Sequence, residues 1–304
     1  MESIIPKIIF IVPYRDRRQE KCIFSVYMKY IMEDYDKNDY EIYYSHQTDA
    51  RPFNRGATKN IGFLVMKNKY PNDYHNITFV FNDVDTLPVK KNTFNYATTK
   101  GIVKHFYGFT FALGGIFSIV GSDFEKCNGF PNNWGWGLED NVMNDRVLLN
   151  EIVINRELFY FRNTRDVISL YDTPHRIINN KEPGNYLANN LNDNLNNITE
   201  LEYTIVPNYD YNTENKIVTS NETSNETSNE TSNETSNSTL KNNIKISTIE
   251  QKEYMINISN FKTYVNPANE MFYTQNTFYN STVTPNLLEK REHRKIWGLH
   301  SRFL

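Results

Sequence analysis

Two aspartates in this 304-residue chain stand where an apolar run ends, a position from which they could bind a cation. Asp83 and Asp85 follow residues 79–81 (Phe-Val-Phe), and side chains at i and i+2 of an extended segment project to the same side. Their hard oxygens suit Mg²⁺ or Mn²⁺, with both on one ion or with one on an ion and one on a ribose hydroxyl. The alternative is a solvated turn that binds nothing.

Two more sets of polar side chains could complete such a site. Asp172 and His175 lie within one turn of each other, so both can reach one ion, and an imidazole ligand would favour Mn²⁺. Arg15 and Arg17 follow the apolar residues 8–12 and could bind a diphosphate, since guanidinium groups match phosphate geometry. A histidine without a ligand and a salt-bridged surface loop are the respective alternatives.

Acids and tryptophans are combined between residues 134 and 140. Glu139 and Asp140 stand beside Trp134 and Trp136. Indole faces pack against the C–H faces of sugars while carboxylates bind sugar hydroxyls, so this combination predicts a sugar-binding platform. The alternative assigns the tryptophans to the core and the acids to the first turn of a helix, where negative charge is favourable.

The elements that must hold these residues are predicted from the hydrophobic pattern. Strands are indicated at 8–12, 41–45 and 77–81, and helices at 22–31, 54–69 and 140–149. The alternation predicts an α/β sheet with parallel neighbours, whose ligand crevice lies beyond the carboxyl ends of its strands. Between Lys100 and Asp145, glycines and aromatics favour irregular backbone around a site.

The composition excludes several classes of protein. The chain has 33 Lys+Arg against 36 Asp+Glu, a formal net charge of −3, and four of the acids belong to a repeat without Lys or Arg. The rest is therefore nearly neutral, and no basic surface for nucleic acid is indicated. With 14% aromatic residues the chain can build the core of one large domain, unlike a collagen or a fully disordered protein.

A repetitive segment divides the chain. Residues 220–238 repeat Ser-Asn-Glu-Thr four times and contain no apolar residue, which is typical of a disordered linker. The predicted division is an α/β domain at 1–215, a linker at 216–243 and a C-terminal segment of unknown role at 244–304. The Asn-x-Thr/Ser sites of the repeat are interpreted as a polar spacer, with glycosylation acceptors as the alternative.

The amino-terminal residues predict neither a signal peptide nor a membrane span, because the apolar run at 8–12 is short and arginines follow it. Cys22 and Cys127 are interpreted as buried thiols, which favours a reducing compartment. We therefore expect a cytoplasmic location. The abundance of Asn, Ile, Lys and Tyr suggests an AT-rich genome of a protist or a large DNA virus, and in the viral case the location would be a virus factory.

Five segments occur in the order, and near the spacing, of one family. They are FIVPYRDR (10–17), FNRGATKNIG (53–62), FVFNDVDTLP (79–88), the Gly-Gly pair at 114–115 and GFPNNWGWGLED (129–140). Over about residues 7–206 the chain thereby resembles the β-1,4-galactosyltransferases, glycosyltransferase family 7. The resemblance implies a GT-A fold, which is a Rossmann-like nucleotide-binding sheet with an Asp-x-Asp metal site, in the domain at 1–215. It also implies an inverting, Mn²⁺-dependent transfer from a UDP-sugar to a glycan or glycoconjugate acceptor.

The resemblance also assigns roles to individual residues. The donor-binding residues that it implies are Pro13, Arg15, Arg17, Phe53, Arg55, Asp83, Val84, Gly115 and Trp136. Asp140 matches the catalytic base, which takes the proton of the attacking acceptor hydroxyl. Glu139, Asp140 and Asn141 match acceptor-binding positions. Asp85 and His175 match metal ligands, and residues 176–190 correspond to a lid over the donor.

Three positions depart from the family pattern. Asp172 replaces a methionine ligand found in many members, which predicts tighter Mn²⁺ binding and possible use of Mg²⁺. Asn141 replaces an aspartate that grips N-acetylglucosamine, so the acceptor can differ. Ala112 aligns with a bulky tyrosine that restricts the donor to galactose, so UDP-GalNAc joins UDP-Gal as a candidate donor.

Two alternatives remain open at the level of sequence. One is a non-catalytic glycan-binding or structural protein on a decayed transferase fold, against which the joint retention of the acidic motifs argues. The other is a chondroitin-polymerase-like module that adds GalNAc by the same chemistry. Animal members of the family are membrane-anchored Golgi proteins, whereas this chain begins close to the start of the resemblance.

Overall fold

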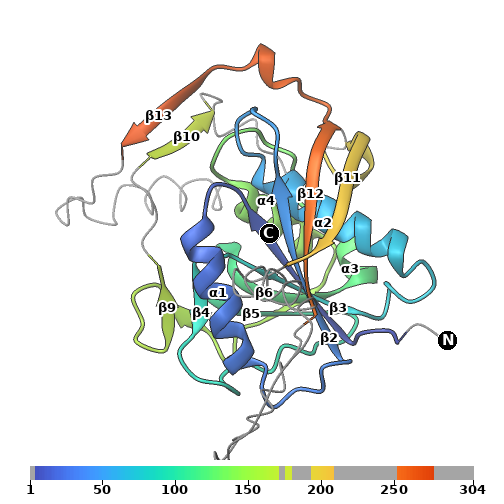
Figure 1. Ribbon diagram of the computed structural model, residues 1–304, viewed down its shortest axis with the longest axis vertical. Helices are drawn as coiled ribbons and strands as arrows, with labels where there is room; N and C mark the ends of the chain where they lie inside the picture. The colour runs from blue at the N-terminus through green and yellow to red at the C-terminus, as the bar shows by residue number, and fades with distance from the viewer. Residues whose placement is uncertain (1–3, 171–174, 180–192, 209–251, 277–304) are drawn as a thin grey trace, which may run out of the picture.

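The computed structural model describes residues 4–170, 175–179, 193–208 and 252–276. Among these residues the main sheet has nine strands, in the order β11-β12-β2-β1-β3-β6-β5-β7, and β8 also pairs with β5 (Figure 1). Its strands are β1 (Ile8–Tyr14), β2 (Tyr40–Gln47), β3 (Thr78–Asn82), β5 (Ile102–Phe109), β6 (Ala112–Val120), β7 (Val153–Asn155), β8 (Tyr160–Phe161), β11 (Thr199–Pro207) and β12 (Glu253–Lys262).

Two small antiparallel sheets flank the main one. They pair β4 (Thr86–Pro88) with β9 (Val167–Ser169), and β10 (His175–Asn179) with β13 (Phe272–Asn276). The helices are α1 (Arg18–Ile31), α2 (Arg55–Lys69), α3 (Gly121–Lys126) and α4 (Glu139–Leu149), with 3₁₀ turns η2 (Leu195–Asn197) and η3 (Pro267–Asn269).

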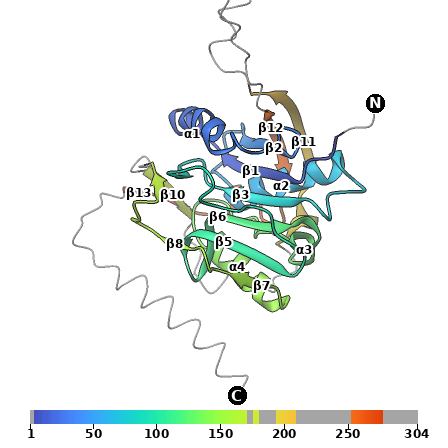
Figure 2. The same cartoon turned by 90° about the horizontal axis from the view of Figure 1, so that it is seen from below.

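The predicted parallel core of the sheet is confirmed, because β1 pairs in parallel with both β2 and β3. Successive side chains of β1 enter different cores: Ile9 and Ile11 join the one that includes α2 residues, while Phe10 and Val12 join the one that includes α1 residues. Figure 2 shows α1 and α4 on opposite sides of the strands. Burial on both faces explains why residues 8–12 of β1 are all apolar. Each such side chain contributes about 1.5–3 kcal/mol to the free energy of unfolding.

Helix α2 is unusually buried for a helix of mixed composition. Asn54 caps it, accepting a hydrogen bond of 2.9 Å from the backbone N–H of Ala57, so the helix begins at Arg55. Every residue from Gly56 to Phe63 is buried. A Cβ on Gly56 would lie 1.9 Å from the carbonyl oxygen of Pro131, so the glycine permits this close approach to the loop that precedes α4.

The expectation of irregular backbone between residues 100 and 145 is wrong for most of that segment. Residues 102–120 form the antiparallel β5–β6 pair, and α3 follows directly. Aromatic and β-branched side chains outweigh the glycines there because they pack into both cores. The interpretation of both cysteines as buried is also half wrong, since Cys22 is exposed on α1 while Cys127 is buried.

The segment beyond the repeat supplies a strand of the main sheet. β12 lies between β11 and β2, antiparallel to the first and parallel to the second. From β12 the chain arches across the molecule to β13, which lies beside β10 (Figure 1). The predicted segment at 244–304 therefore includes residues that complete the sheet, while the predicted linker at 216–243 lies outside the described residues.

Candidate active site

Arg55, the first residue of α2, gathers three carboxylates at one end of the sheet. Its Nη2 donates to Asp83, which follows β3, and its Nη1 donates to Glu139 and Asp140 at the start of α4. The bond to Oδ2 of Asp140 is 2.7 Å long. The guanidinium fork thus joins two acidic motifs that are far apart in sequence.

A second cation holds Asp140 from the same helix. Nζ of Lys59 lies 2.8 Å from Oδ1 of Asp140, and the lysine side chain is only 1% exposed. Burial alone would raise the pKa of the Asp140 carboxyl, but the charges of Arg55 and Lys59 outweigh it and hold that pKa below its usual range. Asp140 is therefore ionised at neutral pH, the state in which a carboxylate can accept a proton.

The backbone before α4 is shaped to place the acids in the first helical turn. Gly137 has φ 128° and Leu138 has φ 65°, a left-handed conformation that is costly for a residue with a side chain. The chain then turns directly into α4 at Glu139. Carboxylates in the first turn are stabilised by the backbone N–H groups of the helix N-terminus.

The Asp-Val-Asp segment has the electrostatics of an incomplete cation site. Asp85 lies close to Asp83, and burial together with this second charge raises the pKa of Asp85 to about 6. The charges of Arg55 and Arg17 oppose the rise. Two crowded carboxylates at the end of a buried strand fit a divalent cation, because a cation would offset both the repulsion and the desolvation.

The other predicted metal ligands are only partly described. The backbone N–H of Leu170 donates to the carbonyl oxygen of Asp85 at 2.8 Å, which brings the end of β9 to the Asp-Val-Asp segment. Asp172 lies outside the described residues, and for His175 only its place at the start of β10 is described. Within the described part of the chain, no cluster of three or more His, Cys, Asp or Glu side chains is arranged to bind a metal.

The remaining predicted donor residues lie around this end of the sheet. Pro13 and Val84 are buried, while Arg15 donates to the carbonyl oxygen of Arg51. The carbonyl of Gly115 accepts from the N–H of Asp83 at 2.9 Å, and that of Phe53 accepts from Gly135 at 3.1 Å. Two of these contacts join motifs in pairs, 79–88 with 114–115 and 53–62 with 129–140.

Trp136 and Trp134 of the sugar-platform motif have different roles. The side chain of Trp136 is 47% exposed, and its backbone N–H donates to the carbonyl oxygen of Ile177 in β10 at 2.8 Å. Trp134 is 1% exposed, stacks on Phe261 of β12 and donates from Nε1 to Thr263 at 2.9 Å. Only Trp136 is therefore available to a ligand, and Trp134 fits the alternative that assigned it to the core.

The β5–β6 hairpin closes the site next to Asp140. A Cβ on Gly114 would lie 2.6 Å from Oδ2 of Asp140, so a side chain at this position would displace the carboxylate. Asn141 donates to the carbonyl oxygen of Phe111 at 3.4 Å, which joins α4 to the hairpin. Ala112 begins β6 and is 6% exposed.

A buried histidine supports this hairpin from behind. Nδ1 of His105 accepts from Nε of Arg156 at 3.0 Å, so Nε2 carries the proton and faces the carbonyl oxygens of Tyr107 and Gly114 at 3.0 and 3.1 Å. Burial, and next the charge of Arg156, lower the pKa of His105 to about 4. The neutral ring thus anchors the strand that carries Gly114.

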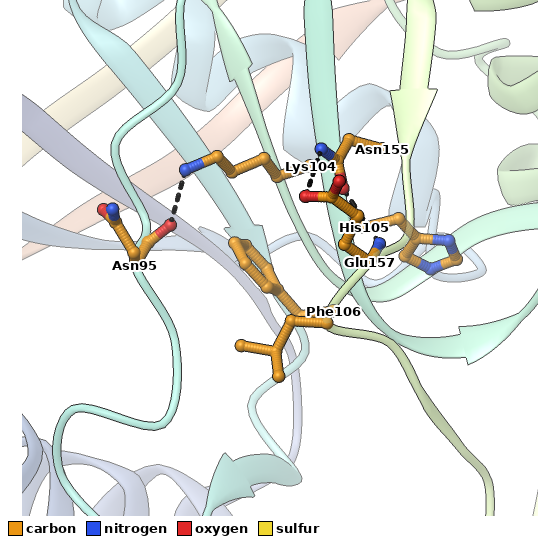
Figure 3. Close-up of a pocket in the computed structure, with 7 residues that line it drawn as sticks. Asn95, Lys104, His105, Phe106, Asn155 and Glu157 are labelled. Atoms are coloured by element: carbon orange, nitrogen blue, oxygen red, sulfur yellow. Dashed lines mark hydrogen bonds between the residues drawn. The ribbon is translucent and has the colours of Figure 1, made fainter.

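A pocket near His105 is separate from the predicted site. The cavity has a volume of about 120 Å³. Among the lining residues drawn in Figure 3, Nζ of Lys104 donates to the carbonyl oxygen of Asn95 at 3.2 Å. Asn155, Glu157 and Leu158 are also among its lining residues, and none of the residues predicted to bind donor, acceptor or metal is. The pocket therefore adds nothing to the cluster around Arg55.

Lys59 was not predicted as a functional residue. A lysine inside a helical segment normally faces solvent, so its charge carried no signal. One signal was present: it stands four residues after Arg55, which places both on the same face of the helix.

Comparisons with known proteins agree with this geometry. Residues 4–98 match the N-terminal region of glycosyl transferase group 7, and residues 103–173 match the N-terminal domain of galactosyltransferase. Among curated proteins, β-1,4-galactosyltransferase 1 of Bos taurus is 32% identical over 51% of this chain and 40% of its own length. The xylosylprotein 4-β-galactosyltransferase of Caenorhabditis elegans is 32% identical over 51% of this chain and 55% of its own. The chain spans about half the length of the curated relatives it matches.

Solved structures of lower similarity include the catalytic domain of Drosophila β1,4-galactosyltransferase 7 with xylobiose. It is 23% identical, with a TM-score of 0.46 over 55% of this chain and 72% of that one. Another structure of that enzyme, with manganese, UDP-Gal and xylobiose, has a TM-score of 0.47.

The expected cytoplasmic location is wrong. The relatives that the chain matches are Golgi-resident, membrane-anchored enzymes, which overturns an inference drawn from the amino-terminal residues and the cysteines. In the described part of the chain, none of the helices combines the length and the apolar character needed to cross a membrane. The viral source stays a prediction.

The two family matches together cover more than half of the chain and contain all the acidic residues around Arg55. They agree with the mixed α/β sheet, so the predicted GT-A fold is confirmed. The chain belongs to the glycosyl transferase group 7 family and is β-1,4-galactosyltransferase-like.

Proposed function

We propose that the protein is an inverting glycosyltransferase that moves galactose or N-acetylgalactosamine from a UDP-sugar to a glycan or glycoconjugate acceptor. The observation that carries the proposal is the junction of Asp83, Glu139 and Asp140 on Arg55. It brings a nucleotide-sugar motif and an acceptor motif to one point, as a direct transfer between two bound sugars requires. The named activities of the matched relatives support the same reaction class.

Asp140 is the proposed catalytic base. Its carboxylate is ionised, and it lies in a helix turn next to Glu139, the proposed acceptor-binding residue. In the proposed reaction the acceptor hydroxyl oxygen forms the new bond to the anomeric carbon, and its proton passes to Asp140. The bond from that carbon to the diphosphate breaks, and UDP leaves with the electron pair.

The charge of the leaving diphosphate requires cations. Arg15, Arg17 and Arg55 are the proposed protein contacts, because guanidinium groups bind phosphate oxygens in bidentate fashion. Asp85, with His175 and Asp172, would hold Mn²⁺ or Mg²⁺, and the raised pKa of Asp85 fits a carboxylate that needs a cation. The bound ion would stabilise negative charge on the diphosphate as the sugar leaves.

Donor and acceptor choice are proposed to depend on the hairpin and on α4. Ala112 offers little bulk, which leaves room for an N-acetyl group on the donor. Its replacement by tyrosine should shift the ratio of UDP-GalNAc to UDP-Gal turnover at least about tenfold toward UDP-Gal, because steric exclusion of one small group costs a few kcal/mol. Exposed Trp136 is the proposed sugar contact, and Asn141 is a proposed acceptor contact.

A panel of UDP-sugars tests the function without knowledge of the acceptor. Mass spectrometry should detect slow hydrolysis of UDP-Gal or UDP-GalNAc with Mn²⁺ and none with EDTA. Glycan binding that ignores both EDTA and UDP, with no donor turnover, would instead favour a non-catalytic glycan-binding protein.

A further inference from the structure

Lys59 is a buried cation with one charged partner at the proposed active site. Its side chain is 1% exposed, its Nζ lies 2.8 Å from Oδ1 of Asp140, and the same nitrogen lies 4.4 Å from the ring centroid of Phe130. An ammonium group is strongly hydrated, so its burial requires compensation by a charge and by polar or aromatic contacts. Asp140 and Phe130 supply both.

The two oxygens of Asp140 have separate partners on one helix. Oδ2 accepts from Arg55 at 2.7 Å and Oδ1 from Lys59 at 2.8 Å. Since Arg55 and Lys59 are four residues apart, the rigid helix fixes the spacing between their charges. Two cations on a rigid element determine both the position and the rotation of the carboxylate.

Arg55 alone cannot fix the rotation of the Asp140 carboxylate, because it also donates to Asp83 and Glu139 and is itself a proposed diphosphate contact. A guanidinium that turned toward the diphosphate would weaken its hold on Asp140. Lys59 has no such second task among the contacts described: it faces Asp140 and the Phe130 ring. It can hold the carboxylate throughout a reaction cycle.

We propose that Lys59 is a positioning residue that keeps Asp140 ionised and fixed in rotation against the acceptor hydroxyl. The inference rests on the proposed function, in which Asp140 is the base. The charged and titratable groups around Asp140 are Arg55 and Lys59 of α2, its neighbour Glu139, Asp83 beyond Arg55, and His105 of β5. Lys59 and Arg55 are the cations in direct contact with the carboxylate.

The test replaces Lys59 by methionine, which keeps the length and apolar stem of the side chain and removes its charge. Lys67→Met is the matched control, because Lys67 lies on the same helix and pairs with Glu125 away from the site. In K59M, kcat for donor turnover should fall about ten- to a hundredfold while the Kd for UDP stays within about twofold. The acidic limb of the pH profile should move up by at least about one pH unit, since an opposite charge is lost. The control should match wild type.

An unchanged pH profile and kcat in K59M would overturn the proposal, and so would a loss of UDP binding equal to the loss of kcat. A double-mutant cycle of K59M and Asp140→Asn, measured by thermal unfolding, tests the interaction between Lys59 and Asp140 without any substrate. K59M should lower the Tm markedly in the wild-type background and little in the D140N background, whereas equal shifts in both backgrounds would overturn the proposal. Because the cycle needs no turnover, a protein that transfers no sugar would refute the proposed function and still report on Lys59.

Discussion

The chain after the repeat should be essential to the fold, while the repeat itself should be dispensable. A chain truncated after Ser220 loses β12, whose residues Ile256, Ile258 and Phe261 are fully buried in the core that includes α2 residues. At about 1.5–3 kcal/mol for each side chain, the loss is about 5–9 kcal/mol. The whole free energy of unfolding of a typical domain is about 5–15 kcal/mol, so the truncated chain should not fold.

Deletion of the segment between β11 and β12, which contains the repeat, is the matched comparison. The backbone N–H of Asn208 donates to the carbonyl oxygen of Glu253 at 2.9 Å, so the two ends of the intervening segment meet as neighbours on antiparallel strands. Replacing residues 209–251 by Gly-Asn-Gly should leave a short hairpin and a Tm equal to or above that of the full chain, because a shorter connection costs less closure entropy.

Circular dichroism melts of the three proteins decide the matter. The prediction is a cooperative transition for the full chain and for the deletion variant, and none for the truncated chain. A truncated chain that melts at the same temperature as the full chain would refute the reasoning, because β12 would then contribute nothing to the core.

Further variants test the site. Gly114→Ala should lower kcat about a hundredfold with little change in UDP binding, because its Cβ would displace Asp140; steady-state kinetics with equal kcat would contradict this. Mn²⁺ should raise the Tm of wild type and not of Asp85→Asn, and equal shifts would remove Asp85 from the proposed ligands. The pKa of His105 is lowered to about 4 in the folded protein from about 6.5 in the unfolded chain, so the folded protein binds fewer protons between these values. Its contribution to the free energy of unfolding is therefore full above pH 6.5 and is lost as the pH falls toward 4. That contribution is about 3 kcal/mol, so His105→Gln should flatten this part of the stability profile in urea melts, and an unchanged slope would contradict it.

Much of the core of the fold was predictable because its signals are local. The runs that became β1 and β3 are mostly apolar, and the helical spacing of the apolar residues of α2 is visible in the sequence. The hairpin at 102–120 was missed because its glycines resemble loop residues until the packing of its aromatics is known. β12 was missed because a strand that follows a long repeat gives no hint of its neighbours in the sheet. It lies between β11 and β2.

The sequence names the acids of the candidate site and the arginine that joins them, but not the contacts between them. The sequence motifs named Asp83, Glu139 and Asp140, because short motifs keep their chemistry within a few residues. The motifs could not show that Arg55 joins all three acids, because that contact depends on where α2 begins relative to α4. The spacing from Arg55 places Lys59 on the same face of the helix, but its burial depends on the packing of α2 against the loop that contains Phe130.

Asp140 is proposed to take the proton of the acceptor hydroxyl, while other residues bind the donor. The most direct measurement compares wild type with Asp140→Asn at saturating Mn²⁺ and UDP-sugar, recording kcat for donor turnover and, in parallel, the Kd for UDP. In D140N, kcat should fall at least about a hundredfold with an unchanged Kd, since a missing general base costs about 10²–10⁴ in rate. A D140N variant with wild-type kcat would contradict it.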